Sequence, residues 1–334
     1  MSEFTNTNDV LAQATNWIES GDGVAIATVI ATWGSSPRPV GSQLAINKNG
    51  SFVGSVSGGC IEGAVITEAL TAISDGKHRI LEFGVSNEQA WEVGLACGGD
   101  IKVLITRVEG SEYLFPLIKD QPIASIIDLS SGNKSYVTNS KATGSLDLTE
   151  KMLIKIRLAL QHDQSQLYHE NSTEIFIHVF NPPLRCAIIG AVHISQALAP
   201  MAEIAGFDVT IIDPRDSFAT NSRFPNVKII NKWPDEALSE LNIDARTAII
   251  TLTHDPKLDD PALHFGLKTD AFYIGCLGSR RTHSLRLERL TESGFETANF
   301  SRIKAPVGLD LGAKSPAEIA TSILAEMIAT KHGK

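Results

Sequence analysis

Two cysteines flanked by glycine are the residues of this chain best suited to sulfur chemistry. Cys60 ends the run GSVSGGC over residues 54–60, and Cys97 begins the run CGG over residues 97–99. Glycine beside a thiol leaves it uncovered and lets backbone N–H groups point at a ligand. The residues after Cys60 have a helical pattern, and the positive end of a helix stabilises a thiolate. We therefore interpret Cys60 and Cys97 as catalytic residues, although a cysteine that only packs is the alternative for each.

A second group of candidate residues occupies a turn in the C-terminal half. Residues 190–195 (GAVHIS) stand where the dinucleotide fingerprint G-x-G-x-x-G belongs, and Asp213 follows 23 residues after Gly190, where an acid binds a ribose hydroxyl. The second fingerprint glycine is replaced by Val192, whose branched side chain obstructs the approach of a pyrophosphate. The turn predicts a Rossmann-like fold and argues against tight NAD(P) binding. His193 in this turn faces a ligand or belongs to the surface.

Other polar loops follow the next predicted strands, at 213–215 (DPR), 253–255 (THD) and 275–282 (GCLGSRRT). Ligands bind beyond the carboxyl ends of parallel strands, where such loops meet. The last of these loops precedes the predicted helix 284–292 and contains glycines, a hydroxyl and two arginines, which favour an anion site. The alternative is that Ser279 only caps the helix and that Arg280 and Arg281 are solvated surface residues. The acids and histidines between 254 and 264 fit no standard metal-ligand spacing, so no metal site is predicted. Asp260 and Pro261 are typical of a helix start.

The elements that must position these residues divide into two halves. Residues 1–107 combine an amphipathic helix at 10–18 with strands at 24–32, 43–46, 51–56 and 101–106, which predicts an α+β domain. Residues 108–182 form a variable connecting segment that we expect to pack on this domain. Strands and helices alternate over 183–334, which predicts a Rossmann-like domain with a doubly wound parallel sheet and an overall α/β class. Pro182 and Pro183 mark the boundary.

Composition limits the function classes. The chain has 334 residues, 43% hydrophobic content and a net charge of −9, without a basic stripe, which argues against a nucleic-acid partner. No apolar run has transmembrane length, and the first residues lack a signal-peptide pattern, so we expect a cytoplasmic protein without a membrane partner. The four cysteines are widely spaced, which favours reduced thiols over a structural zinc site.

Several runs, in this order, resemble the xanthine dehydrogenase accessory factor family, also called the XdhC/CoxI family. The similarity covers most of the chain and is weakest between about 108 and 175. The runs are 34–39 (GSSPRP), 54–62 (GSVSGGCIE), 97–99 (CGG), 213–215 (DPR), 253–255 (THD), 273–275 (YIG), 278–281 (GSRR) and 306–310 (PVGLD). The family usually has Gly-Ala-Gly-His at the Rossmann turn, where this chain has Val192 in place of the second glycine.

The resemblance implies a maturation factor for molybdenum hydroxylases such as xanthine dehydrogenase. Such a factor binds the molybdenum–pterin cofactor, works with a cysteine desulfurase that replaces an oxo ligand by sulfido, and delivers the cofactor to the apoenzyme. It is a cofactor-binding chaperone more than a turnover enzyme, and Cys60 could contact molybdenum. A homodimer is the common default. The motifs and loops above assign cofactor binding to Ser36, Arg38, Gly58, Gly59, Glu62, Gly98, Gly99, Gly190, His193, Asp213, Arg215, His254, Asp255, Gly278, Ser279, Arg280, Arg281 and Asp310.

Two other functions stay open. One is an NAD(P)-dependent oxidoreductase, against which Val192 counts. The other is an interaction scaffold that binds a hydroxylase without touching its cofactor.

Overall fold

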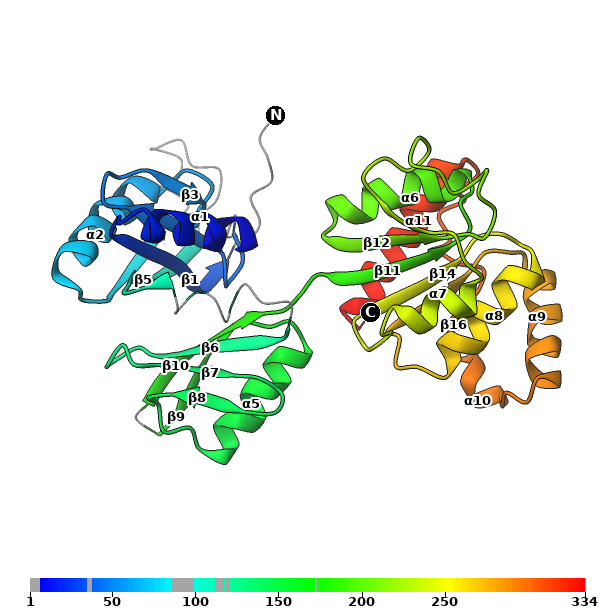
Figure 1. The fold of residues 1–334 in the computed structure, drawn as a ribbon. Coiled ribbons are helices and arrows are strands. Elements are labelled where there is room, and N and C mark those ends of the chain that lie inside the picture. Colours follow the sequence, from blue (N-terminus) through cyan, green and yellow to red (C-terminus); the bar gives the residue numbers. More distant parts are fainter. Residues whose placement is uncertain are drawn as a thin grey trace. The chain divides into compact units, whose positions relative to one another are not determined.

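The computed structural model describes residues 7–34, 38–85, 99–111, 114, 117, 121–171 and 173–333. The chain divides into two compact units, Met1–Pro182 and Pro183–Lys334. The division falls between two consecutive prolines, which can join neither a helix interior nor a central sheet strand. Within the described ranges, none of the helices has both the length and the apolar character needed to span a membrane. Figure 1 shows the fold within each unit.

Unit 1 begins with a five-stranded antiparallel sheet in the order β3-β2-β1-β5-β4. Alternate side chains of β1 point to opposite faces, so Ala25 and Ala27 pack on helix α2 while Val24 and Ile26 pack on helix α1. The Cys60 loop joins β3 to α2, so this packing fixes both of its ends. The elements are α1 (Thr7–Glu19), β1 (Val24–Gly34), β2 (Gln43–Asn47), β3 (Phe52–Gly54), α2 (Glu62–Asp75), β4 (Arg79–Val85) and β5 (Gly99–Val108).

The segment between the two predicted domains forms a second antiparallel sheet, in the order β8-β7-β6-β10-β9. Helix α5 covers one face, and Ile127 and Phe176 on the other face pack against Ile30 and Leu104 of the first sheet. The elements are β6 (Ile123–Asp128), β7 (Lys134–Val137), β8 (Ala142–Gly144), α5 (Glu150–Gln161), β9 (Gln166–Glu170) and β10 (Thr173–Phe180).

Unit 2 contains a six-stranded parallel sheet in the order β13-β12-β11-β14-β15-β16. The chain starts in the middle at β11, builds outward through β12 and β13, and returns to the other side of β11 at β14. The elements are β11 (Leu184–Ile189), α6 (His193–Ile204), β12 (Phe207–Ile212), β13 (Lys228–Ile230), α7 (Pro234–Glu240), β14 (Thr247–Thr251), α8 (Pro256–Leu267), β15 (Tyr273–Cys276), α9 (Arg280–Glu292), α10 (Thr297–Phe300), β16 (Ile303–Lys304) and α11 (Pro316–Lys331).

Both faces of this sheet are buried. Cys186 and Ile188 of β11 point into the core beneath α6 and α11, and Ala187 and Ile189 point into the core beneath α7 and α8 (Figure 1). A strand buried on both faces is expected to be a nearly continuous apolar run, as residues 186–189 of β11 are; Arg185, near the start of the strand, is half-buried. The prediction of a Rossmann-like, doubly wound domain after an α+β domain is therefore confirmed. Helix α8 begins at Pro256, capped by Asp255, so the helix start predicted at Asp260 was wrong.

Candidate functional site

The loop that carries Cys60 is wound around the carboxylate of Glu62. Oε1 of Glu62 accepts hydrogen bonds from the Ser55 hydroxyl at 2.8 Å, the Val56 N–H at 3.2 Å and the Ser57 N–H at 2.9 Å. Oε2 accepts from the Ser57 hydroxyl at 2.5 Å and the Gly59 N–H at 2.9 Å. Five donors on one buried carboxylate fix the loop conformation, because each satisfies a polar group that would otherwise be left unpaired.

These contacts decide the charge of Glu62. Burial raises the pKa of its carboxyl, but hydrogen bonds from Ser57 and Ser55 outweigh burial and lower the pKa to about 2. Glu62 is therefore an anion at any physiological pH. Its oxygens are occupied by the loop, so its visible role is to hold the residues that precede it.

Cys60 is exposed, two residues before helix α2 begins. The Ser57 hydroxyl accepts the N–H groups of Cys60 and Ile61, each at 3.0 Å, so the backbone at the thiol is fixed. Cys186 and Cys276 are buried, and burial raises the pKa of both thiols to about 12. Among the cysteines in the described ranges, Cys60 is thus the one open to a partner or ligand.

The glycines before Cys60 serve conformation first. Gly58 has φ +77° and Gly59 has φ +117°, in the region that favours glycine. A side-chain carbon at Gly59 would meet no atom within 4 Å, so the surface beside Cys60 is open. Arg38, between β1 and β2, reaches the Cys60 loop, since its Nε lies 3.4 Å from the Ser55 carbonyl oxygen. Gly99 pairs with Gly34 at the ends of β5 and β1. The predicted residues Ser36, Cys97 and Gly98 lie outside the described residues.

In unit 2 the turn after β11 approaches the loop after β14. Gly190 has φ +108°, and a side-chain carbon there would lie 2.5 Å from Cγ2 of Thr253. Glycine is required at 190 for both reasons. Val192 is half-buried in extended backbone at the start of α6, and His193 is exposed.

Asp213 is fully buried and is bound by the protein itself. Its Oδ2 accepts the Ala191 N–H at 2.8 Å and Nη2 of Arg215 at 2.6 Å, while Oδ1 accepts the N–H and Nε of Arg215 at 3.0 and 2.8 Å. Burial raises the pKa of Asp213, but the bonds from Arg215 and Ala191 outweigh it and hold the pKa below its usual value. A ribose hydroxyl would have to compete with Arg215 for this carboxylate.

Two other predicted residues cap helices. Asp255 accepts the Lys257 N–H at 3.0 Å at the start of α8, and Ser279 accepts the Thr282 N–H at 3.2 Å at the start of α9. The remaining predicted residues lie on loops or at helix starts: His254, Arg280 and Asp310 are exposed, and Gly278 is half-buried with φ +144°. Nowhere in the described ranges do three or more His, Cys, Asp or Glu side chains gather to hold a metal ion.

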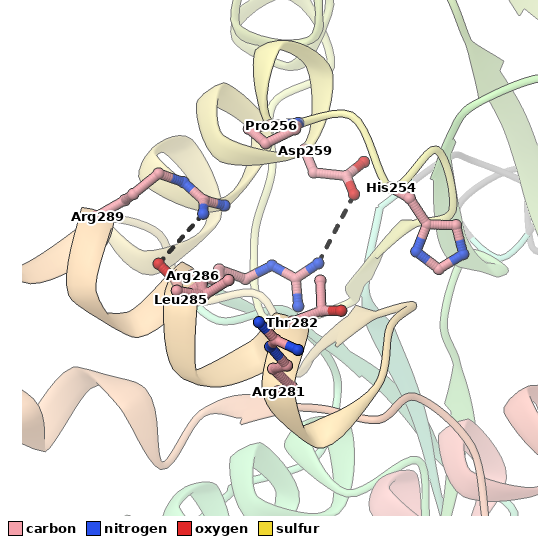
Figure 2. A pocket seen from close by; sticks show the side chains of 8 residues that line it. All are labelled: His254, Pro256, Asp259, Arg281, Thr282, Leu285, Arg286 and Arg289. Atoms are coloured by element: carbon pink, nitrogen blue, oxygen red, sulfur yellow. Dashed lines mark hydrogen bonds and ion pairs between the residues drawn. The ribbon is translucent and has the colours of Figure 1, made fainter.

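A pocket of about 370 Å³ lies between α8 and α9 (Figure 2). It brings together two predicted residues, His254 and Arg281, with side chains that no sequence motif assigned to a site. Arg286 is the most notable, since it is 2% exposed and its Nη2 lies 3.8 Å from Oδ2 of the equally buried Asp259. The sequence could have indicated a buried arginine here, because Arg286 lies four residues before the core residue Leu290 and so shares the buried face of α9. The lining residues are His254, Pro256, Asp259, Arg281, Thr282, Leu285, Arg286 and Arg289.

Known proteins share this organisation. The family described as "XdhC and CoxI family" matches residues 17–84, and the one described as "XdhC Rossmann domain" matches residues 186–327. The molybdenum cofactor insertion chaperone PaoD of Escherichia coli (strain K12) is 28% identical over 326 residues, 96% of this chain and 88% of that protein. A protein of Bacillus subtilis (strain 168), named as a probable xanthine dehydrogenase component, is 28% identical over 325 residues, 94% of this chain and 95% of that protein.

A solved structure supports the fold. A crystal structure of a xanthine dehydrogenase from Bacillus halodurans superimposes with a TM-score of 0.75 at 24% identity, over 97% of this chain and 96% of that one. The two family matches follow in chain order and take in both the Cys60 loop and the carboxyl edge of the unit 2 sheet. The chain belongs to the XdhC and CoxI family.

Proposed function

We propose that this protein is a maturation factor that binds a molybdenum–pterin cofactor and assists its sulfuration and its insertion into a molybdenum hydroxylase such as xanthine dehydrogenase. The observation that carries the proposal is the exposed Cys60 on a loop held by the buried Glu62 carboxylate. Similarity to a molybdenum cofactor insertion chaperone over nearly the whole chain supports it.

Cys60 can act in two ways, and both require its thiolate form. A thiolate is a soft ligand for molybdenum, and it is also a nucleophile. In sulfur transfer, the Cys60 thiolate attacks the outer sulfur of a persulfide on a cysteine desulfurase. The desulfurase S–S bond breaks, its cysteine leaves as a thiolate, and Cys60 becomes the persulfide, so no further oxidant is needed.

The cofactor would lie over the open face of the loop. Gly58, Gly59 and Cys60 are exposed there, and no side chain crowds Gly59. Arg38 lies beside the loop and supplies positive charge for the anionic cofactor. We assign Ser36, Cys97 and Gly98 to the same site on their sequence motifs. The apoenzyme, the desulfurase and a second copy of this chain are the proposed partners.

The test compares Cys60→Ala with the wild type and with Cys186→Ala, which removes a buried thiol instead. Cofactor retention is measured by absorbance, and activation of a molybdenum hydroxylase apoenzyme is measured with the desulfurase present. We expect Cys60→Ala to lose retention or activation with an unchanged circular dichroism spectrum, and Cys186→Ala to keep both. Activation at the wild-type rate by Cys60→Ala would overturn the proposal. Activation by a wild-type protein that retains no cofactor would favour the scaffold.

A further inference from the structure

Arg286 carries a buried charge that its surroundings only partly satisfy. Its Nη2 donates to the Leu277 carbonyl at 2.9 Å, but Nε and Nη1 have no hydrogen-bond partner among the described residues. The nearest carboxylate, Asp259, is 3.8 Å from Nη2, beyond hydrogen-bond distance. Leaving buried donors of a cation unpaired costs free energy, so an oxygen-rich anion in the pocket that Arg286 lines would relieve that cost.

The other charges around the pocket leave a positive excess. Arg289 is neutralised, because its Nε and Nη2 donate to the two oxygens of Asp260 at 2.6 and 3.0 Å. Arg281 is exposed in the first turn of α9, where the helix dipole also favours an anion. Figure 2 shows the Arg286 guanidinium between Asp259 and this first turn. Asp259 and Arg286 offset one another, so Arg281 provides the excess charge.

Asp259 has an unused acceptor of its own. Its Oδ1 accepts the Thr253 hydroxyl at 2.7 Å, while Oδ2 has no hydrogen-bond partner in the described part of the chain. Burial raises the pKa of this carboxyl, although the Thr253 bonds and the charge of Arg286 offset part of the effect. A ligand that fits must therefore present acceptors to Arg286 and a donor, such as a hydroxyl, to Asp259.

We infer that the pocket between α8 and α9 binds the phosphate group of a hydroxyl-bearing phosphate ester, with Arg286 as its buried anchor. The volume of about 370 Å³ is at the small end of the range for ligand sites, which suits a phosphate and the few atoms next to it. Both free nitrogens of Arg286 are covered, so ligand binding requires a rotamer change in the pocket lining, in which Arg281 and Leu285 are exposed side chains.

This site stands on its own contacts, and only the identity of the ester rests on the proposed function. A pterin cofactor and a nucleotide both carry such a phosphate. Binding of a small phosphate ester needs neither a client enzyme nor Cys60, so its failure and the failure of the proposed function are separate results.

The test titrates the full-length protein with inorganic phosphate, glycerol 3-phosphate and glycerol at constant ionic strength, by calorimetry and thermal shift. We expect phosphate to bind, glycerol 3-phosphate to bind more tightly, and glycerol not to bind. Arg286→Met should weaken phosphate binding at least tenfold, while Lys228→Met, which removes an exposed cation of β13 that does not line the pocket, should leave it unchanged. Equal affinity of the wild type and Arg286→Met, or no phosphate binding by the wild type, would overturn the inference.

A second variant covers the case in which Arg286→Met does not fold. Asp259→Asn removes the carboxylate that repels a phosphate but keeps an oxygen for the Thr253 hydroxyl. It should tighten binding of inorganic phosphate several-fold, and weaker or unchanged binding would contradict the site. Cytidine 5′-monophosphate and the phosphate-bearing pterin are then compared on the wild type. The site is supported whichever of the two binds more tightly, and the tighter ligand identifies the source of the phosphate group.

Discussion

Ser57 donates to Glu62 twice, from its backbone N–H at 2.9 Å and from its hydroxyl at 2.5 Å. The same hydroxyl accepts the N–H groups of Cys60 and Ile61. The position of the exposed thiol therefore depends on a carboxylate that does not touch it. This relationship explains why a buried carboxylate, Glu62, stands at the start of the helix that follows the cysteine.

Glu62→Gln should loosen the loop without unfolding α2. The amide loses the negative charge and presents an N–H₂ group toward donors such as the Gly59 N–H, so we expect the free energy of unfolding to fall by about 1–2 kcal/mol, allowing for partial solvent screening. Hydrogen exchange over residues 55–61 should accelerate. The control is Glu68→Gln in the same helix, whose carboxylate is half-exposed and pairs with Arg79 at 3.1 Å. Equal exchange in the two variants would show that Glu62 does not hold the loop.

Stability should fall in mild acid because of His178. This imidazole is buried, its Nε2 lies 3.1 Å from the Gly41 carbonyl oxygen, and burial lowers its pKa to about 4 from an ordinary 6.5. Between those values the unfolded chain takes up a proton that the native protein refuses, so stability is lost as pH falls from 6.5 toward 4. The total is about 3 kcal/mol.

Urea unfolding at pH 7 and pH 5 measures this effect. His178→Gln keeps a donor for Gly41 but cannot titrate, so it should be less stable than the wild type at pH 7 and lose about 2 kcal/mol less on acidification to pH 5. The exposed His332, replaced in the same way, serves as the control. An unchanged slope in His178→Gln would mean that other groups cause the acid sensitivity.

Gly190→Ala tests the contact between the turn after β11 and the loop after β14. The new carbon would lie 2.5 Å from Cγ2 of Thr253, at a φ that disfavours a side chain, so we expect a loss of about 2–4 kcal/mol. Thr253→Ser removes that methyl group and keeps the hydroxyl that bonds Asp259. Adding it to Gly190→Ala should recover part of the loss. No recovery would assign the whole cost to the backbone.

The prediction from sequence was strongest where side-chain periodicity decides the structure. The alternation of strands with helices over 183–334 indicated a doubly wound parallel sheet, and unit 2 contains one. It was weakest where tertiary contacts choose among equivalent local signals. Both Asp255-Pro256 and Asp260-Pro261 are typical helix starts, and the first is used because Asp255 caps α8 while Asp260 binds Arg289 of another helix.

The residues of the candidate site also differ in how far the sequence could predict their roles. Exposed, glycine-flanked Cys60 could be named from its motif, because the motif itself creates the exposure. The roles of Asp213 and Arg286 could not. Asp213 bonds Arg215 two residues later, and Arg286 meets Asp259 from a neighbouring helix, and both depend on rotamers that packing selects.

The pair Asp213–Arg215 leads to the last prediction, which concerns NAD(H). Two features obstruct a dinucleotide in unit 2: the Val192 side chain stands where the fingerprint has glycine, and Arg215 occupies the carboxylate that would bind a ribose. Val192 obstructs the pyrophosphate and Arg215 competes with the ribose, so we expect the wild type to bind NAD(H) weakly by calorimetry. Val192→Gly should improve binding modestly.

Arg215→Met alone should gain little, since the pyrophosphate path stays closed, and it should destabilise unit 2 by about 2 kcal/mol by leaving the buried Asp213 with fewer donors. The double variant Val192→Gly/Arg215→Met should bind NAD(H) at least tenfold more tightly than either single variant, and prefer it to NADP(H), because the Asp213 carboxylate repels a 2′-phosphate. Adding Asp213→Asn should abolish that preference while restoring stability. Micromolar binding by the wild type would show that neither Val192 nor Arg215 blocks the site, and the oxidoreductase alternative would gain the support that the obstructed turn now denies it.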